Sequence, residues 1–136
     1  MYSKEIEVRA GTTAVVHDLT RDVEAFLAEC DGDDGLLQVW VPHATAGLVV
    51  IETGAGSDDD LLTAINGLLP RDNRWRHQHG TQGHGRDHVL PAFLPPHATV
   101  PVLGGSLTLG TWQSICLVDT NVDNPVRRVR FSFLPG

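Results

Sequence analysis

No apolar run in this chain is longer than four residues, and glycine, proline or polar residues separate one run from the next. Residues 48–51 and 115–118 are two of the longest runs. A helix that crosses a bilayer needs about 20 predominantly apolar residues, so the sequence predicts no membrane-spanning helix. Short runs that are rich in β-branched residues are typical of strands. We therefore expect a strand-rich domain.

Seven segments have the alternation or the β-branched composition of strands. They are residues 2–8, 12–17, 36–41, 47–53, 98–103, 107–119 and 126–134. The sequence Asn-Val-Asp-Asn-Pro at 121–125 predicts a turn that joins the last two strands as a hairpin.

Two helices are expected among the earlier strands. The first carries apolar residues at helical spacing, namely Val23, Phe26, Leu27 and Cys30. The second begins at Ser57, where three aspartates suit the helix dipole, and it ends at Pro70. This order of elements predicts a single α+β domain over residues 1–136, with packed antiparallel sheets.

The charge of the chain restricts its partners. The formal net charge is -7, with ten Lys and Arg residues among 136. This balance argues against binding to a nucleic-acid backbone or to an anionic membrane, because both need a basic surface. The N-terminal residues lack the apolar segment of a secretory signal, so we expect a cytoplasmic protein. Cys30 and Cys116 are expected to be buried reduced thiols, although the sequence leaves their pairing open.

Histidines are concentrated in one part of the chain. Five of the seven lie between residues 77 and 97, namely His77, His79, His84, His88 and His97. The composition of residues 71–90 predicts a long polar loop, and such loops are often functional. Imidazole is the commonest protein ligand for transition metals, so the histidines indicate a metal site or acid–base chemistry, with zinc favoured. The alternative is a solvated loop whose histidines share no role.

His43 is a separate candidate at the end of a predicted strand. Small residues follow it and let a ligand approach the backbone closely. Glu52 comes near His43 if residues 41–47 form a hairpin, and otherwise it is a solvated carboxylate.

Four polar or aromatic residues near the C-terminus also allow two interpretations. Trp112 is either a core residue or a stacking platform, and Gln113 needs hydrogen-bond partners within an apolar strand. Asp119 and Arg127 form either a simple ion pair or, in a cleft, an acid–base residue and an anion clamp.

Two motifs resemble those of the YjbQ-like family, also called the secondary thiamine-phosphate synthase family. Residues 107–113, Leu-Thr-Leu-Gly-Thr-Trp-Gln, match the family's Leu-x-Leu-Gly-Thr-Trp-Gln. Residues 43–48, His-Ala-Thr-Ala-Gly-Leu, are similar to its His-Thr-Thr-Ala-Gly-Leu.

Weaker matches extend the resemblance over nearly the whole chain. Ile51-Glu52 is similar to the family's Asn-Glu, Trp75-Arg76-His77 to its Tyr-x-His, and Asp87-His88 to its Ala-His. The segment from Asp119 to Arg127 loosely keeps a closing Glu-x-Asp-Gly-Pro-Arg.

The resemblance implies a β-sandwich of about seven mostly antiparallel strands with two main helices, assembled as a homotrimer. It also implies a divalent metal ion and a small phosphorylated ligand. The resemblance carries over His43, Glu52, His77, His88, Trp112, Gln113, Asp119 and Arg127 as site residues. We expect His43, His77 and His88 to bind the metal and Glu52 and Asp119 to act in catalysis. We expect the substrate to be bound by Trp112, Gln113 and Arg127, together with Thr45 and Arg76.

The implied activity is a metal-assisted, weak or secondary thiamine-phosphate synthase reaction. This reaction joins a pyrimidine pyrophosphate to a thiazole phosphate and releases pyrophosphate. Two alternatives stay open, namely a metal-dependent hydrolase of a small substrate and a noncatalytic trimer that binds a metal or a metabolite. The chain departs from the family pattern at Ala44, Ile51 and Asp119, which favours these alternatives over full synthase activity.

Overall fold

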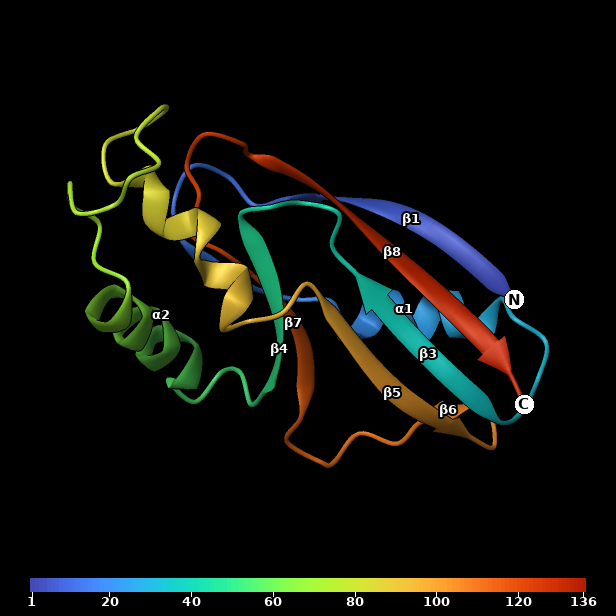
Figure 1. Ribbon diagram of the computed structural model, residues 1–136. Helices are drawn as coiled ribbons and strands as arrows, with labels where there is room; N and C mark the ends of the chain where they lie inside the picture. The colour runs from blue at the N-terminus through green and yellow to red at the C-terminus, as the bar shows by residue number, and fades with distance from the viewer.

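Eight strands form two antiparallel sheets in the computed structural model, which describes residues 1–136 (Figure 1). The five-stranded sheet has the order β1 (Tyr2–Arg9), β8 (Val126–Pro135), β3 (Gly35–Trp40), β5 (His97–Leu103), β6 (Ser106–Leu107). The three-stranded sheet has the order β2 (Val15–Asp18), β7 (Ser114–Asp119), β4 (Ala46–Ile51). The predicted α+β class with mostly antiparallel strands is confirmed.

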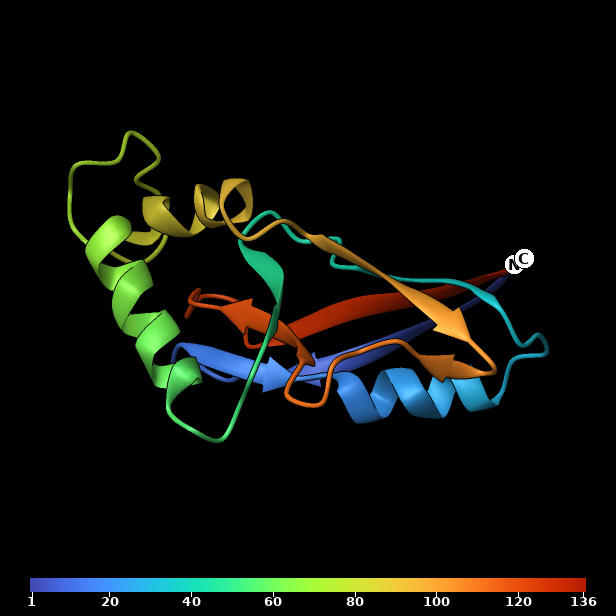
Figure 2. The same cartoon turned by 90° about the horizontal axis from the view of Figure 1, so that it is seen from below.

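The main hydrophobic core lies between the two sheets and helix α1 (Thr20–Ala28), which runs along the larger sheet (Figure 2). Its bulkiest residues include Phe26, Leu37, Leu117, Phe131 and Phe133. The rings of Phe26 and Phe131 lie 5.9 Å apart between centroids, so α1 contacts the larger sheet directly.

Helix α2 (Ser57–Leu68) covers the outer face of the smaller sheet. Ile65 and Leu69 form a second buried cluster there with Leu90 and with Val118 of β7. The smaller sheet is therefore buried on both faces, which agrees with the continuous apolar run at 115–118.

The strand predicted at 107–119 is interrupted. Leu107 ends β6 in the larger sheet, and Ser114 begins β7 in the smaller sheet. Between them, Gln113 donates its backbone N–H to the Gly110 carbonyl at 3.0 Å, and its Oε1 accepts the Gly110 N–H at 2.8 Å. This local turn satisfies the hydrogen-bonding groups of Gln113 outside a strand. It lies where the chain leaves the larger sheet and enters the smaller one.

The hairpin predicted at 121–125 between the last two strands is wrong, because β7 and β8 belong to different sheets. The hairpin at 41–47 that would bring Glu52 near His43 is absent for the same reason, since β3 and β4 also belong to different sheets. Residues 41–45 cross from one sheet to the other instead of reversing the chain within one sheet. Strand β4 then carries the chain about 16 Å away at roughly 3.3 Å per residue. Glu52 follows at the far end of β4 and is exposed to solvent.

Two other predicted boundaries also shift. The second strand covers residues 15–18 rather than 12–17, since Ala10 and Gly11 both donate to the Pro125 carbonyl and the chain turns there. The loop predicted at 71–90 ends early, because η1 (His84–His88) and η2 (Leu90–Ala92) are 3₁₀ helices. Residues 84–87 are buried, although their composition is polar.

Candidate functional site

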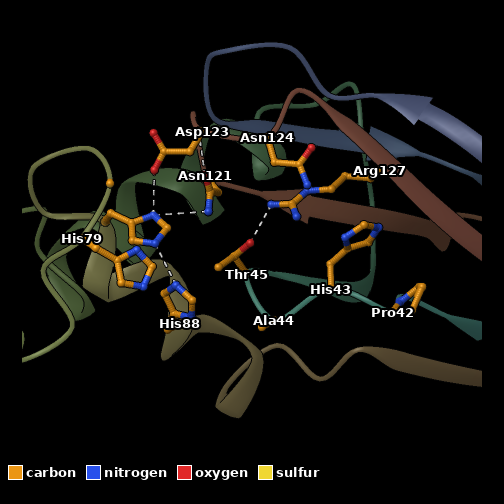
Figure 3. A pocket seen from close by; sticks show the side chains of 12 residues that line it. Pro42, His43, Ala44, Thr45, His79, His88, Asn121, Asp123, Asn124 and Arg127 are labelled. Atoms are coloured by element: carbon orange, nitrogen blue, oxygen red, sulfur yellow. Dashed lines mark hydrogen bonds and ion pairs between the residues drawn. The ribbon is translucent and has the colours of Figure 1, made fainter.

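A polar cavity of about 600 Å³ lies where three segments meet. The first wall is the segment 42–45, which precedes β4, and the second is the segment 79–88. The third wall consists of the turn that precedes β8 and the first residues of β8, together residues 121–127. Figure 3 shows histidines on one side of the cavity and Arg127 with His43 on the other. The lining residues are Pro42, His43, Ala44, Thr45, His79, Gly80, His84, His88, Asn121, Asp123, Asn124 and Arg127.

Four imidazoles form a cluster on the histidine side of the cavity. The ligand atoms of His77, His79 and His84 all lie within 4.8 Å of one another. His88 joins them, since its Nε2 is 2.8 Å from the Nε2 of His84 and its ring stacks on that of His77 at 3.7 Å between centroids. We call these four residues the histidine cluster.

Glycine at position 85 allows the histidine cluster to form. A Cβ at Gly85 would clash with the Trp75 side chain and with the His77 carbonyl, so only glycine lets η1 lie against this part of the loop. Arg86, which is buried, donates from its guanidinium to the Leu69 carbonyl at 3.2 Å and thereby ties η1 to the end of α2.

A buried carboxylate fixes the other side of η1. Asp87 is fully buried, accepts a hydrogen bond from the Thr120 hydroxyl at 2.5 Å and pairs with Arg71 at 3.4 Å. Arg71 also donates to the Thr120 carbonyl at 2.6 Å. These contacts join η1 to the end of β7 and so fix the directions of His84 and His88.

A buried ion pair forms the opposite side of the cavity. Arg127 is 1% exposed and donates to both carboxylate oxygens of Asp119, from Nε at 2.7 Å and from Nη2 at 3.0 Å. The same Nη2 donates to the Thr45 hydroxyl at 2.8 Å. The two residues therefore form a buried ion pair, of which Arg127 lines the cavity and Asp119 lies behind it.

His43 lies on the cavity but apart from the histidine cluster (Figure 3). Its Nε2 accepts the backbone N–H of Arg128 at 2.9 Å, so this nitrogen is already used. Burial, followed by the positive charges of Arg127 and Arg128, lowers the pKa of His43. His43 therefore faces the cavity as a neutral imidazole at pH 7.

The histidine cluster fits a transition-metal ion. The Nε2 of His77 is buried and has no hydrogen-bond partner, which is costly unless something binds it. Burial is the main cause that lowers the pKa values of His77 and His88, and the neighbouring imidazoles lower them further. Neutral, closely spaced imidazoles are the form that binds Zn²⁺ and similar ions.

The structure places only some of the predicted site residues together. His43, Thr45, His88 and Arg127 line the cavity. Asp119 lies directly behind Arg127, and His77 lies in the histidine cluster. The other four are exposed and outside the cavity, namely Glu52, Arg76, Trp112 and Gln113.

Trp112 is 72% exposed, so it is not a core residue. Antiparallel pairing explains its position, because Ala46 lies opposite Asp119 at the cavity end while Ile51 lies opposite Ser114 at the other end. Trp112, Gln113 and Glu52 flank that second end.

Several residues of the cavity have no individual role in the sequence-based prediction. His79 and His84 belong there to the histidine-rich segment only, and Asn121, Asp123 and Asn124 belong only to a predicted turn. The histidine count was the signal that could have found the first two. His97 stacks on Trp40 at 6.5 Å between centroids and is not among the cavity residues.

Comparisons with known proteins agree with the fold. The family model described as UPF0047 protein YjbQ-like matches residues 4–136. The chain is 62% identical over 119 residues to UPF0047 protein Mb2586c of Mycobacterium bovis, covering 88% of this chain and 91% of that protein. It is 31% identical over 137 residues to UPF0047 protein YugU of Bacillus subtilis, covering 98% of each.

Solved structures are similar over the whole chain. A YbjQ-like protein of unknown function from Sulfolobus solfataricus P2 matches with a TM-score of 0.92 and 27% identity, covering 99% of this chain and 97% of that one. The conserved hypothetical protein TT1486 from Thermus thermophilus matches with a TM-score of 0.81 and 32% identity, covering 96% of this chain and 99% of that one. The names of these relatives state no activity. None of the helices of this chain is long and apolar enough to span a membrane.

Proposed function

The chain belongs to the UPF0047 YjbQ-like family, and from the histidine cluster that faces a buried guanidinium we propose that it is a metal-dependent enzyme acting on a small phosphorylated substrate. The observation that carries this proposal is that two opposite sides of one cavity offer complementary kinds of ligand. One side offers nitrogen ligands for a cation, and the other offers donors for an anion. Their separation by a single open cavity suits a substrate that contacts both.

The histidine cluster would hold the metal. His77, His79 and His84 offer nitrogens close enough to share one ion, and His88 lies beside them. Imidazole ligands suit Zn²⁺ and related divalent ions better than Mg²⁺ or Ca²⁺. Such an ion, when bound, supplies a Lewis acid that neutralises phosphate oxygens.

The fixed charges of the cavity support a requirement for the cation. The charge of Arg127 is balanced by Asp119, and Asp123 adds a further carboxylate on the same cavity. The lowered pKa values of His43, His77 and His88 leave these imidazoles neutral at pH 7. Without a metal the cavity therefore has no net positive charge to attract a phosphate group.

The arginine side of the cavity would bind the phosphate group of the substrate. Arg127 is held rigidly by Asp119 and Thr45, so its guanidinium loses little freedom when an anion binds. His43 and Asn124 line the same side and can add hydrogen bonds. Transfer of a pyrimidine group from pyrophosphate to a thiazole phosphate, the reaction that the family resemblance suggests, needs both a neutralised leaving group and a held acceptor phosphate.

Metal analysis of the purified protein tests the first half of the proposal. We expect about one equivalent of a transition metal per chain, lost in the double variant His84→Ala/His88→Ala. His97→Ala is the matched control, because this histidine is not among the cavity residues. The same metal content in all three proteins, or none in any, would show that the histidine cluster is not a metal site.

An activity assay tests the second half. With the metal present, the wild type and His97→Ala should form thiamine phosphate from the two precursors. Arg127→Lys should be slower by about tenfold or more, since an ammonium group cannot reproduce the planar guanidinium that pairs with Asp119 and still offers an N–H to the substrate. Product formation that is unchanged in the double histidine variant would point to a contaminant. Full metal binding without turnover of these precursors would reject this reaction.

A further inference from the structure

Asp123 contacts the Nδ1 edge of His84, whereas His88 contacts the Nε2 of the same ring. Its Oδ2 is 2.9 Å from the Nδ1 of His84 (Figure 3). Asn121 also approaches this nitrogen, but its Nδ2 is farther away at 3.4 Å. Asp87 is still farther, with 3.9 Å between its Oδ2 and the same Nδ1. Asp123 is therefore the principal partner of this edge of His84.

The loop before η1 contacts the carboxylate of Asp123 through Thr81. Thr81 donates to it twice, from its hydroxyl to Oδ1 and from its backbone N–H to Oδ2 at 3.2 Å. An ionised carboxylate can only accept hydrogen bonds.

This contact decides which nitrogen of His84 carries hydrogen. Two acceptors do not face each other at 2.9 Å, so Nδ1 must carry a hydrogen and donate it to Asp123. In that tautomer Nε2 has a free lone pair. The Nε2 of His84 points at the Nε2 of His88, 2.8 Å away, within the histidine cluster.

We propose that Asp123 is a positioning residue, which fixes the tautomer and the ring orientation of His84 so that its Nε2 ligates the divalent ion; this inference rests on the proposed metal site. A carboxylate that accepts the second ring N–H of a ligating histidine is a frequent arrangement in metal sites. Asp123 contacts Nδ1 and not Nε2, so it acts through His84.

Two sets of contacts hold Asp123 itself. Within its own turn, the Asn121 side-chain oxygen accepts the Asp123 N–H at 2.7 Å, and Asp119 accepts the Asn121 N–H at 3.0 Å. Across the cavity edge, Thr81 ties the carboxylate to the preceding loop. Because Asp119 also holds Arg127, a continuous series of hydrogen bonds joins the guanidinium to His84.

Cobalt titration of the metal-free protein tests this role. The visible absorption of bound Co²⁺ reports both affinity and coordination geometry. We expect Asp123→Ala to bind Co²⁺ about 10–100-fold more weakly than the wild type, the usual effect of removing such a partner. Asp123→Asn should recover part of the loss, because its amide oxygen can accept the same hydrogen bond. Asp72→Ala, which removes a solvent-accessible carboxylate that pairs with Arg74 in the loop before η1, should bind like the wild type.

A second measurement does not depend on metal binding. Nitrogen-15 spectra of the metal-free protein should place the hydrogen of His84 on Nδ1 in the wild type and in Asp72→Ala, and lose this preference in Asp123→Ala. A wild-type His84 with its hydrogen on Nε2 would overturn the inference. Equal Co²⁺ affinity in Asp123→Ala would overturn it while leaving the metal site intact, whereas a wild type that binds no Co²⁺ would reject the proposed function as well.

Discussion

Replacing Asp119 by asparagine should destabilise the protein strongly, because it leaves the Arg127 charge buried without a counterion. The two residues are each 1% exposed, and the carboxylate receives both Nε and Nη2 of the guanidinium. Breaking a buried pair from one side costs about 3–5 kcal/mol. The nearby cavity lets water approach Arg127, so we take the lower value, about 3 kcal/mol.

This cost corresponds to a measurable change in melting temperature. With an unfolding entropy of about 2.1 cal/mol/K per residue, 136 residues give roughly 0.29 kcal/mol/K, so about 3 kcal/mol lowers Tm by about 10 °C. Urea unfolding followed by circular dichroism, at one fixed protein concentration, measures the free energy of unfolding. A double variant, Asp119→Leu with Arg127→Met, should recover most of the loss, since apolar residues can replace a buried pair at little cost.

An exposed ion pair provides the matched control for this experiment. Lys4 and Glu29 are 3.1 Å apart with side chains 48% and 59% exposed. Glu29→Gln should therefore cost less than about 1 kcal/mol. If Asp119→Asn costs no more than Glu29→Gln, or if the double variant is less stable than Asp119→Asn, the argument from burial is wrong.

Four further predictions follow from other parts of the molecule. Gly85→Ala should abolish metal binding and lower the melting temperature, because its Cβ clashes with Trp75, and an unchanged metal content would contradict this. The metal-free protein should lose stability as pH falls below about 6.5, since the unfolded chain binds protons to His77 and His88 more strongly than the folded one does. The free energy of unfolding in urea should therefore decrease from about pH 7.5 to about 5.5, and a constant value would contradict this. Burial raises the pKa of Cys116 to about 12, so its thiol should not react with a disulfide reagent at pH 8 until the protein unfolds. Light scattering should give about three times the 14.7 kDa chain mass if the chain is a homotrimer, and a monomer mass would refute that assembly.

The trimer prediction has a surface that suits it. Leu36 lies opposite both Leu134 and Pro101 on one face of the larger sheet, and Leu103 follows two residues later on the same face. Leu36, Leu103 and Leu134 are each between 47% and 61% exposed. Adjacent exposed apolar side chains of this kind favour burial against another protein surface.

The strands could be predicted because their signal is local. Alternation, β-branched residues and turn residues located seven of the eight, and only the two-residue β6 was merged with β7. That error has a physical origin, since Gln113 satisfies its hydrogen bonds in a turn with Gly110 that composition does not reveal. The sheet to which each strand belongs is a long-range property, and the hairpin predicted at 121–125 failed for that reason, because β7 and β8 lie in different sheets.

The candidate site divides in the same way. Histidine enrichment located the loop, and Asp119 and Arg127 lie close together in the sequence on either side of the turn at 121–125. The histidine-rich loop and this pair could therefore be predicted from the sequence. The sequence could not distinguish His79 and His84 from His97, because convergence depends on how η1 packs against residues 75–77.

By itself, then, the amino-acid sequence determined the fold class, the family and the region where the histidines lie, because these depend on composition, short motifs and near neighbours. Only the tertiary structure decided which side chains share one cavity. The antiparallel register of β4 and β7 puts Thr45 and Asp119 at one end, and Glu52 and Gln113 at the other. That separation arises because β4 and β7 are far apart in the sequence and pair antiparallel. Position along the chain tells which residues begin and end a strand, but only the pairing of the two strands decides which residues become neighbours in space.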